Sequence, residues 1–433
     1  MKFVADLHIH SKYSRAVSRN MVLEELDRWA DDKGILVMGT GDFTHPAWFR
    51  EIKEKLEPAE PGLFKLKSHL KKPTLKNTLA ETRFLLSVEI SCIYSRGGKT
   101  RRVHHIVMAP DLETAEKINT QLSWVGKLAS DGRPILGLDS EKLAEIVFTA
   151  NPEAVMVPAH AWTPWFSVFG SMSGFDSLEE CFGKYTDKIF AIETGLSSDP
   201  PMNWRVPALD KIALISNSDS HSLQRIGREA NVFDTELSYK GIMDAIKNGS
   251  PSTSSGRLSR FIETIEFFPE EGKYHYDGHR ACGVVMPPSE TKKHKDLCPK
   301  CGKKLTIGVV YRVSQLAAKD RPEGYQDAKR VSFKNLVTLD SIIGEALDVG
   351  KATKSVMKEY EKLIKAFGSE FTILQDTPIK EIALASKPEI AEGVRRMREG
   401  KLKIEPGYDG EFGVIKIFDE EDRKKIDSQN SLF

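Results

Sequence analysis

Histidine and carboxylate residues recur at short spacings along the first half of the chain. Three segments hold close pairs of them: DLHIH with His8 and His10, GDFTH with Asp42 and His45, and SNSDSH with Asp219 and His221. Four further positions add candidates: Glu89, His104 with His105, His160, and Glu193. Imidazoles bind Zn, Mn or Fe, and a carboxylate can bridge two ions. Two ions about 3.5–4 Å apart can activate a water and stabilise the leaving oxygen of a phosphoester. One such pair alone would indicate little, but the whole set predicts a metal-dependent hydrolytic centre.

A second set of ligand residues lies later in the chain and has the spacing HxxC…CxxC. Its members are His279, Cys282, Cys298 and Cys301. Four protein ligands close the coordination of a tetrahedral ion, so the pattern predicts a structural zinc site. His275 and His294 are alternative ligands that fit the spacing less well. The other two cysteines, Cys92 and Cys181, are expected to be buried thiols.

The first ligand set follows a series of apolar, β-branched runs that predict strands. These runs are Lys2–Leu7, Gly34–Gly39, Arg83–Ile90, Val103–Ala109, Ala154–Pro158, Lys188–Thr194 and Lys211–Ser216. Most of them end on or beside a candidate ligand, whereas the two histidines of the fourth stand near its start. Helical patterns lie between the runs, at Met21–Lys33, Leu112–Leu122 and Ser140–Thr149. Alternating strands and helices predict a largely parallel sheet, either a distorted barrel or a doubly wound sheet. In barrels, catalytic residues gather at the carboxyl ends of the strands.

The turn-rich segment 250–257, SPSTSSGR, predicts a boundary after this region. Helical patterns follow at Asn335–Asp348, Thr353–Phe367, Pro378–Ala385 and Pro388–Glu399, and Gly407–Phe418 predicts a hairpin. We therefore predict four parts: a metallophosphoesterase domain at 1–258, a zinc-binding module at 259–313, a mainly helical domain ending in a hairpin at 314–425, and a flexible tail at 426–433.

Composition limits the class of protein. The 433 residues include 63 Lys and Arg against 62 Asp and Glu, which excludes binding to DNA by bulk charge but not through local basic patches. No apolar run approaches the roughly 18 residues of a membrane span, and the first ten residues lack a secretory pattern. We expect an intracellular, cytoplasmic protein without a membrane partner.

The segments DLHIHSKYS, GDFTH, SVEIS, HHIVMA, VPAH and SDSHS resemble motifs of the polymerase and histidinol phosphatase (PHP) family. This resemblance covers about residues 1–250. It implies a distorted (β/α)7 barrel with three metal ions of Zn, Mg or Mn type that hydrolyses phosphoesters. His8, His10, Glu89 and Asp219 would hold one ion and form the catalytic core. Glu89 would also bridge to a second ion, held by His105 and His160, and His45 and His221 would hold the third. His105 is preferred to His104 because it directly precedes the apolar IVMA. Arg15 stands where many members have an Asp, which leaves the third ion with the weakest support.

The order of the parts is similar to that in the endonuclease Q family: barrel, HxxC…CxxC, then a helical region ending in PGYDGEFG. This similarity spans nearly the whole chain. It implies a DNA repair endonuclease that flips a base and nicks the strand 5′ to hypoxanthine, uracil, xanthine or an abasic site. Attack of a metal-activated water would leave a 3′-hydroxyl and a 5′-phosphate. Two alternatives stay open, a small-molecule phosphatase of the histidinol phosphatase type and a non-catalytic clamp or scaffold protein.

Basic and aromatic segments near the ligands are candidate contacts to double-stranded DNA. Lys71 and Lys72 lie in KLKSHLKKPTLK, and Arg101 and Arg102 lie in RGGKTRR. Each run could track phosphates or could be an ordinary solvated face. The segment Ala161–Phe175, with Trp165 and Ser171, could stack on a flipped base or could be a packed lid over the barrel.

The chain ends in DSQNSLF, which resembles a shortened form of the motif that docks repair enzymes on the sliding clamp. Leu432 and Phe433 would fill an apolar pocket, and Gln429 would form a hydrogen bond beside it. The alternative is a frayed tail with a chance apolar end.

Overall fold

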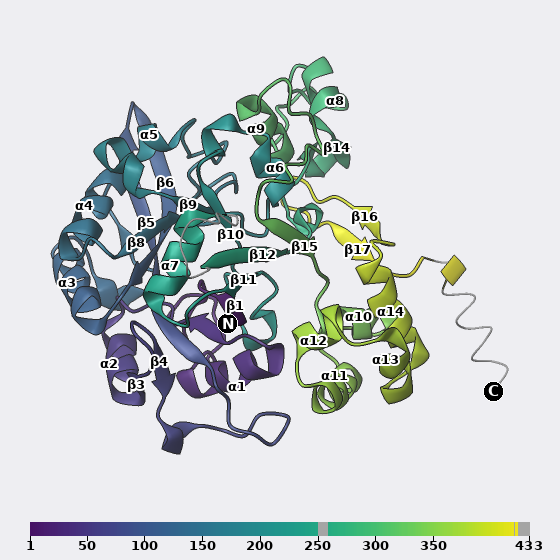
Figure 1. The fold of residues 1–433 in the computed structure, drawn as a ribbon. Helices are drawn as coiled ribbons and strands as arrows, with labels where there is room; N and C mark the ends of the chain where they lie inside the picture. The colour runs from purple at the N-terminus through teal and green to yellow at the C-terminus, as the bar shows by residue number, and fades with distance from the viewer. Residues whose placement is uncertain (250–258, 420, 423–433) are drawn as a thin grey trace.

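The computed structural model describes residues 1–249, 259–419 and 421–422, and it is a mixed α/β protein with a helical C-terminal region (Figure 1). No described helix is both long enough and apolar enough to cross a membrane. Gln429, Leu432 and Phe433 lie outside the described residues, so clamp binding stays a prediction.

An eleven-stranded mixed sheet forms the centre of the molecule. Its main path runs β15-β12-β11-β1-β2-β5-β4-β3, and β5 also pairs with β6 and β7, while β6 pairs with β8. The strands are β1 (Lys2–Asp6), β2 (Val37–Gly39), β3 (Leu56–Pro58), β4 (Phe64–Leu66), β5 (Arg83–Arg96), β6 (Lys99–Ala109), β7 (Ile135–Leu136), β8 (Val155–Pro158), β11 (Ala230–Asp234), β12 (Arg260–Glu266) and β15 (Ser332–Asn335). β9 (Ala191–Glu193) and β10 (Ala213–Ile215) form a separate parallel pair. Among the described strands no ladder joins β8 to β9, so closure into a (β/α)7 barrel stays a prediction.

Each of the seven apolar runs of the first half overlaps a strand of the structure, although β5 and β6 extend beyond their runs. The expectation of a largely parallel sheet holds only for some neighbours, because β1 pairs with β2 and β2 with β5 in parallel, whereas β5, β6 and β8 run antiparallel. β5 and β6 form one long hairpin that turns at Gly97 and Gly98, both with positive φ. Such a two-residue turn needs this backbone conformation, which Gly adopts without steric cost.

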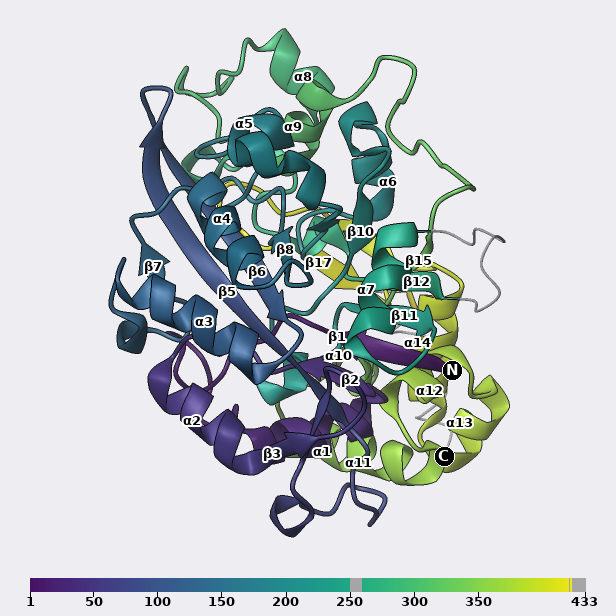
Figure 2. The ribbon, with the colours of Figure 1, turned by 60° about the vertical axis from the view of Figure 1, so that its left-hand side comes forward.

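Helices cover the outer face of the sheet, with α3, α4 and α5 beside β5, β6 and β8 (Figures 1 and 2). The first half contains α1 (Leu23–Lys33), α2 (Pro46–Lys55), α3 (Leu112–Ser123), α4 (Ser140–Ala150), α5 (Leu178–Phe182), α6 (Pro200–Trp204) and α7 (Tyr239–Asn248). Asp111 and Asp139 accept hydrogen bonds from backbone N–H groups in the first turns of α3 and α4. These side-chain caps satisfy N–H groups that lack a partner within the helix, and so they fix where each helix begins.

The ligand-rich segment after β12 forms a small region of its own, at the upper right of Figure 1. It contains β13 (Asp277–His279), β14 (Val284–Met286), α8 (Pro288–Lys293) and α9 (Val309–Leu316). Its apolar cluster consists of Val284, Met286, Cys298 and Leu305. So few apolar residues bury little surface, which is the usual condition of a module stabilised by a metal.

The C-terminal region is helical, as predicted, and ends in a hairpin. Its elements are α10 (Leu339–Ala346), α11 (Lys354–Phe367), α12 (Glu370–Gln375), α13 (Ile379–Ala385), α14 (Pro388–Arg398), β16 (Lys403–Glu405) and β17 (Val414–Lys416). α12 docks on α1 through a buried ion pair in which Lys33 Nζ lies 2.5 Å from Glu370 Oε2. β12 and β15 pair within the main sheet, although the predicted division assigns them to the zinc module and the helical domain. That four-part division stays a prediction.

Candidate metal centre

Four predicted ligands from three separate strands meet in one buried group. His8 and His10 follow β1, Glu89 lies within β5, and Asp219 follows β10; one ligand atom of each lies within 4.8 Å of the others. His10 Nε2 is 3.1 Å from Asp219 Oδ1 and 3.2 Å from Glu89 Oε2. His8 Nε2 is buried without a hydrogen-bond partner and lies 3.7 Å from each of the same two oxygens. A buried ring nitrogen directed at two carboxylates fits a divalent ion as its missing partner.

Glu89 also belongs to a second group, with His104 and His160. Glu89 Oε1 lies 2.7 Å from His104 Nδ1 and 2.9 Å from His160 Nε2. The carboxylate therefore offers Oε2 to the first group and Oε1 to the second. This is the arrangement of a carboxylate that bridges two ions.

The structure places His104, and not the predicted His105, in the second group. Glu89 pairs with Ile106 across the β5–β6 ladder, and side chains two residues apart on a strand share a face. His104 therefore faces Glu89, whereas His105 faces the other side, where its Nε2 lies 2.7 Å from Ser140 Oγ. Burial lowers the pKa of His105 to about 3, so this histidine is a neutral core residue.

Two carboxylates stand behind the ligands and orient them. Glu193 Oε1 is 3.0 Å from His8 Nδ1, and Asp42 Oδ1 is 3.1 Å from His10 Nδ1. These contacts fix each ring so that its Nε2 points into the first group. The sequence marks Glu193 and Asp42 as candidate ligands at strand ends, and the structure gives them this supporting position.

Arg133 is a charged residue of the centre that the sequence did not indicate. It lies between α3 and β7, and its Nη1 is 3.0 Å from Glu89 Oε2. No motif surrounds Arg133 in the sequence, so only the fold brings its guanidinium to the ligands.

The charges of the group support one another. Burial raises the pKa of Glu89, but its close contact with His104 and the charge of Arg133 outweigh it and hold that pKa well below its ordinary value. Burial likewise opposes ionisation of Asp219, whose pKa is nevertheless lowered by the hydrogen bond from His10 and the charge of His8. Both carboxylates are therefore charged at neutral pH and are available as ligands.

The backbone is unusual where it presents these side chains. Asp42, His160 and Asp219 have φ values of 51°, 31° and 45°, in a region that non-glycine residues rarely occupy. The β2–α2 connection also approaches the segment that follows β1 closely, because a Cβ on Gly41 would lie 2.3 Å from the Ile9 carbonyl oxygen. Strained positions of this kind cluster at functional sites.

The predicted third ion receives no assembled group. Within the described residues, no set of three or more ligand atoms includes His45 or His221. His45 stacks on Tyr13 with ring centroids 4.3 Å apart, and the His221 ring lies 4.7 Å from that of His10. Arg15, at the position of the family Asp, pairs with Asp131 at 3.3 Å. His45 and His221 as ligands stay a prediction.

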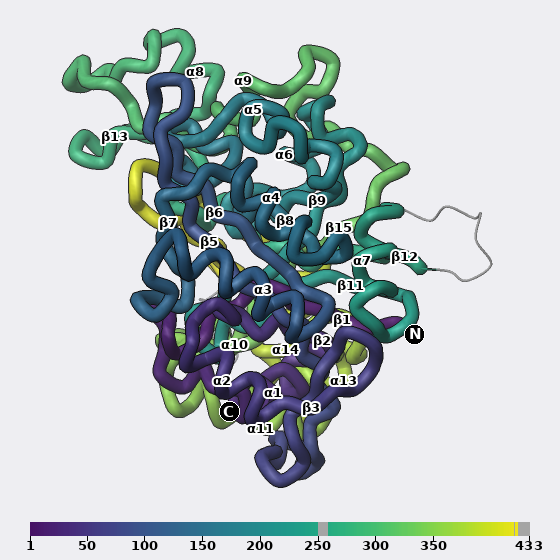
Figure 3. The backbone as a smooth tube through the Cα atoms, turned by 90° about the vertical axis from the view of Figure 1, so that its left-hand side faces the viewer, coloured from purple at the N-terminus to yellow at the C-terminus, as the bar shows by residue number. Residues whose placement is uncertain are grey.

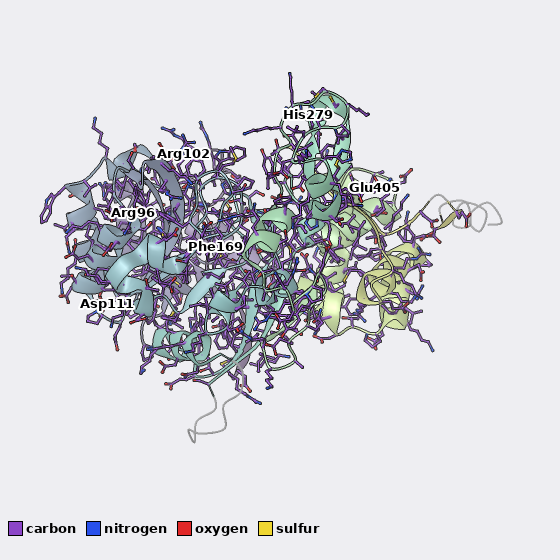
Figure 4. All side chains as sticks on the ribbon, turned by 90° about the horizontal axis from the view of Figure 1, so that it is seen from above. Arg96, Arg102, Asp111, Phe169, His279 and Glu405 are labelled. Carbon is purple, nitrogen blue, oxygen red and sulfur yellow. The ribbon has the colours of Figure 1, made fainter. Side chains whose placement is uncertain are left out.

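The second predicted ligand set assembles as expected, with His279, Cys282, Cys298 and Cys301 in one group and neither His275 nor His294 in it. Burial raises the pKa of the Cys298 thiol, but the backbone N–H groups of Lys300 and Cys301 outweigh it, and the pKa falls to about 6. The thiolate is the form that binds metal. Figure 4 shows His279 at the outer edge of the molecule, apart from Phe169 and Arg102.

The candidate DNA contacts fall into different surroundings. Arg101 donates to the Gly174 carbonyl and lies over the Phe175 ring at 4.1 Å, so it holds the segment 161–175 in place. Arg102 lies 5.8 Å from the centre of the Phe166 ring. Trp165 contacts Tyr274, and Ser171 is half-buried in the same segment. Away from this segment, Lys71 donates to the Ala80 carbonyl and Lys72 pairs with Glu25 on α1. DNA binding by these residues stays a prediction.

Comparison with known proteins places this geometry in a family. The family model of the MJ0043 C-terminal domain matches residues 338–401, which include α10 to α14. The crystal structure of the lesion-specific endonuclease PfuEndoQ from Pyrococcus furiosus matches with a TM-score of 0.82 and 31% identity, over 100% of this chain and 99% of that one. The chain belongs to the endonuclease Q family.

Two further known proteins match this chain. A crystal structure of endonuclease Q with a 27-mer duplex substrate, which carries an abasic lesion at the active site, matches with a TM-score of 0.81 and 31% identity over 97% of this chain and 98% of that one. The uncharacterised protein MJ0043 of Methanocaldococcus jannaschii is 32% identical over 59% of this chain. The match spans only 31% of the length of that curated relative.

Proposed function

We propose that this chain is a metal-dependent DNA repair endonuclease that nicks the phosphodiester 5′ to deaminated bases and abasic sites. The observation that carries the proposal is Glu89, whose two oxygens belong to different ligand groups. Similarity to endonuclease Q over the full chain gives the site its substrate class. Action on chromosomal DNA would place the enzyme in the cytoplasm at the nucleoid, and the fold of the family would supply the (β/α)7 barrel.

Each residue of the centre has a distinct role in this proposal. Divalent ions of Zn, Mg or Mn type, held by the two ligand groups, would activate a water and offset charge on the phosphodiester. His8, His10 and Asp219 fix the first group, while His104 and His160 fix the second. Glu193 and Asp42 hold the two histidine rings of the first group in the orientation that directs Nε2 at the ions. Arg133 brings a fixed positive charge to the side of Glu89, where the scissile phosphate would lie.

Lesion selection would depend on flipping the target base toward the segment that follows His160. This segment is held from outside, because Arg312 of α9 donates to the carbonyls of Phe169 and Phe175, each at 2.9 Å. A fixed pocket edge near Trp165 and Ser171 would select bases that leave the stack at low cost, as deaminated and abasic positions do. The duplex bound in the related endonuclease Q structure and the ligand group of the predicted zinc module also favour an endonuclease over a small-molecule phosphatase.

The proposal is tested with labelled duplexes that carry one inosine, one uracil or one abasic site. With Mg²⁺ or Mn²⁺ the protein should cut 5′ to the lesion and leave an undamaged duplex intact. The matched control is Asp219→Asn, which keeps the shape of the side chain but removes a charged ligand, and its nicking should fall by orders of magnitude with an unchanged circular dichroism spectrum. Phosphate release from histidinol phosphate without nicking would support the phosphatase instead, and neither activity would support a scaffold.

Docking of the C-terminal tail on a sliding clamp remains part of the proposal. Deleting residues 429–433 should abolish clamp binding in solution and leave nicking of a short duplex unchanged. Clamp affinity that survives the deletion would show that Gln429, Leu432 and Phe433 are not the anchor.

A further inference from the structure

Phe412 is an aromatic side chain held in solvent at a sharp turn. It lies between β16 and β17, and 71% of its surface is exposed. Lys273 Nζ is 4.4 Å from the centre of its ring, and within the described part of the chain Lys273 forms no ion pair. An exposed phenylalanine beside a free ammonium group offers a partner both an apolar face and a positive charge.

The turn that carries Phe412 is fixed by hydrogen bonds to other segments. The N–H groups of Gly407, Gly410 and Gly413 donate to the carbonyls of Glu270, Lys273 and Glu271, at 2.8, 2.9 and 3.1 Å. Asp409 accepts from the Arg280 N–H and from the Thr306 hydroxyl, both at 2.6 Å. The backbone is therefore ordered before any partner arrives, so presenting Phe412 to a ligand costs little conformational entropy.

The segment that anchors this turn also contacts the segment that follows His160, through one aromatic pair. The segment 270–276 that anchors it includes Tyr274, whose ring centroid lies 5.6 Å from that of Trp165. Trp165 belongs to the segment that follows the ligand His160. In Figure 3 the yellow turn between β16 and β17 lies at the left edge of the molecule, beneath β13. Figure 4 shows the yellow hairpin with Glu405 beside the green region that carries His279.

We propose that Phe412 inserts into the base stack of the duplex where the flipped nucleotide leaves a gap, while Lys273 binds a flanking phosphate. This inference rests on the proposed lesion endonuclease activity and names how its duplex substrate is held. Flipping removes one layer of stacking, and an apolar ring that replaces it lowers the cost of the flipped state. A base stacks on any aromatic ring, so the contact requires no particular sequence.

The test compares three variants on the same lesion in duplex and in single-stranded DNA. Phe412→Ala should lower nicking of the duplex about tenfold or more, in line with the loss of one base–aromatic stack. It should leave the single strand unaffected, because a single strand has no gap to fill. Phe412→Trp should retain duplex nicking. The matched control is Leu384→Ala, since Leu384 is 90% exposed on α13, and this variant should behave as the wild type.

A binding measurement separates this inference from the proposed function. With 2-aminopurine beside an abasic site, uncut duplex bound by Asp219→Asn should lose fluorescence as the ring stacks on the probe. The double variant Asp219→Asn/Phe412→Ala should leave the probe bright. Equal quenching by both proteins would overturn the inference, and so would equal loss of duplex and single-strand nicking in Phe412→Ala. Quenching that depends on Phe412, in a wild-type protein that nicks no lesion, would support the inference and overturn the endonuclease activity.

Discussion

The Glu89 carboxylate offers a different oxygen to each ligand group. Successive side chains of β6 point to opposite faces of the sheet, and this alternation decides which histidine completes the second group. His104 and His105 are adjacent in sequence and are both buried. Only His104 faces Glu89, at 2.7 Å. The two histidines therefore form a natural pair for separating a role at the metal centre from a role in the core.

We expect His104→Asn to lower nicking at least 100-fold and to reduce the metal content, because the second group loses one of its three ligands. His105→Asn should keep activity and metal content, and should lower the free energy of unfolding by about 1 kcal/mol through the loss of the Ser140 contact. Metal analysis, nicking rates and urea unfolding of the two variants check this. Full activity in His104→Asn would show that His104 is not a ligand.

At the scale of an element, the β5–β6 hairpin shows which features of the site the sequence can predict and which it cannot. The apolar runs predicted both strands, but the choice of His105 came from the following IVMA. A better signal was present in Gly97 and Gly98, a pair typical of a two-residue hairpin turn. If the ladder starts with Arg96 opposite Lys99, seven further steps along each strand place Glu89 opposite Ile106. His104 is two residues from Ile106 and therefore lies on the same face of the sheet. Arg133 could not be found in this way, because its approach to Glu89 depends on packing between distant segments.

β15 could not be predicted for a related reason. It reads SFKN, with one strongly apolar residue, and it becomes a strand by pairing in parallel with β12. The zinc region and α9 lie between these two strands in the sequence. Local pattern carries little information about a partner so distant, whereas α10, α11, α13 and α14 have apolar faces of their own and were predicted. The short α12 was not predicted.

Arg312 of α9 donates hydrogen bonds to the segment after His160. Replacing Arg312 tests whether the reaction requires this segment to be fixed in position. Arg312→Met leaves the Phe169 and Phe175 carbonyls without their donor, at a cost of about 1–3 kcal/mol each. We expect kcat/KM for lesion duplex to fall about tenfold, because misplacing a positioning segment slows the reaction. Steady-state kinetics and Tm measure the two effects.

The control for this variant is Arg321→Met. Arg321 also joins distant segments, since it donates to the Trp204 carbonyl at 2.9 Å and pairs with Asp210, but it does not contact the segment after His160. It should lose thermal stability and keep its kcat/KM. If both variants show a lower Tm and an unchanged kcat/KM, the segment after His160 needs no support from α9.

The zinc module gives a second prediction at this scale. Cys298→Ser should lose the zinc of that module and lower Tm, because the small apolar cluster of this region cannot replace the free energy of metal binding. His294→Ala changes a non-ligand histidine of the same module and should alter neither quantity. Zinc content that stays unchanged in Cys298→Ser would refute the ligand assignment.

At the scale of the whole molecule, buried acids make stability depend on pH. Burial raises the pKa of Glu266 to about 8, and the charge of Asp199 adds to the shift, although the hydrogen bond from Thr194 opposes it. An unfolded chain releases this proton near the ordinary value of about 4.3. Between these two values the folded state binds more protons than the unfolded state. The contribution of Glu266 to stability is therefore complete at low pH, falls as pH rises through this window, and is lost above about pH 8.

Glu266→Gln removes this titration and keeps the shape of the side chain. The Tm of the variant relative to the wild type should rise by several degrees between pH 5 and pH 9. Scanning calorimetry at fixed ionic strength measures the difference, and Asp244→Asn, on the exposed face of α7, serves as a control that should show no such trend. A constant difference across the range would show that Glu266 ionises in the folded protein as it does in the unfolded chain.

The left-handed backbone at Asp42, His160 and Asp219 has a consequence for any programme of laboratory evolution. Each such residue costs the folded state on the order of 1–3 kcal/mol compared with a relaxed conformation. Glycine would remove that cost at all three positions, and it would also remove two ligands and the support of His10. A selection for heat resistance alone would therefore favour replacements that raise thermal stability and abolish the proposed catalytic activity. Libraries that seek thermostable variants should hold these three codons fixed and vary the zinc module and the helical region instead.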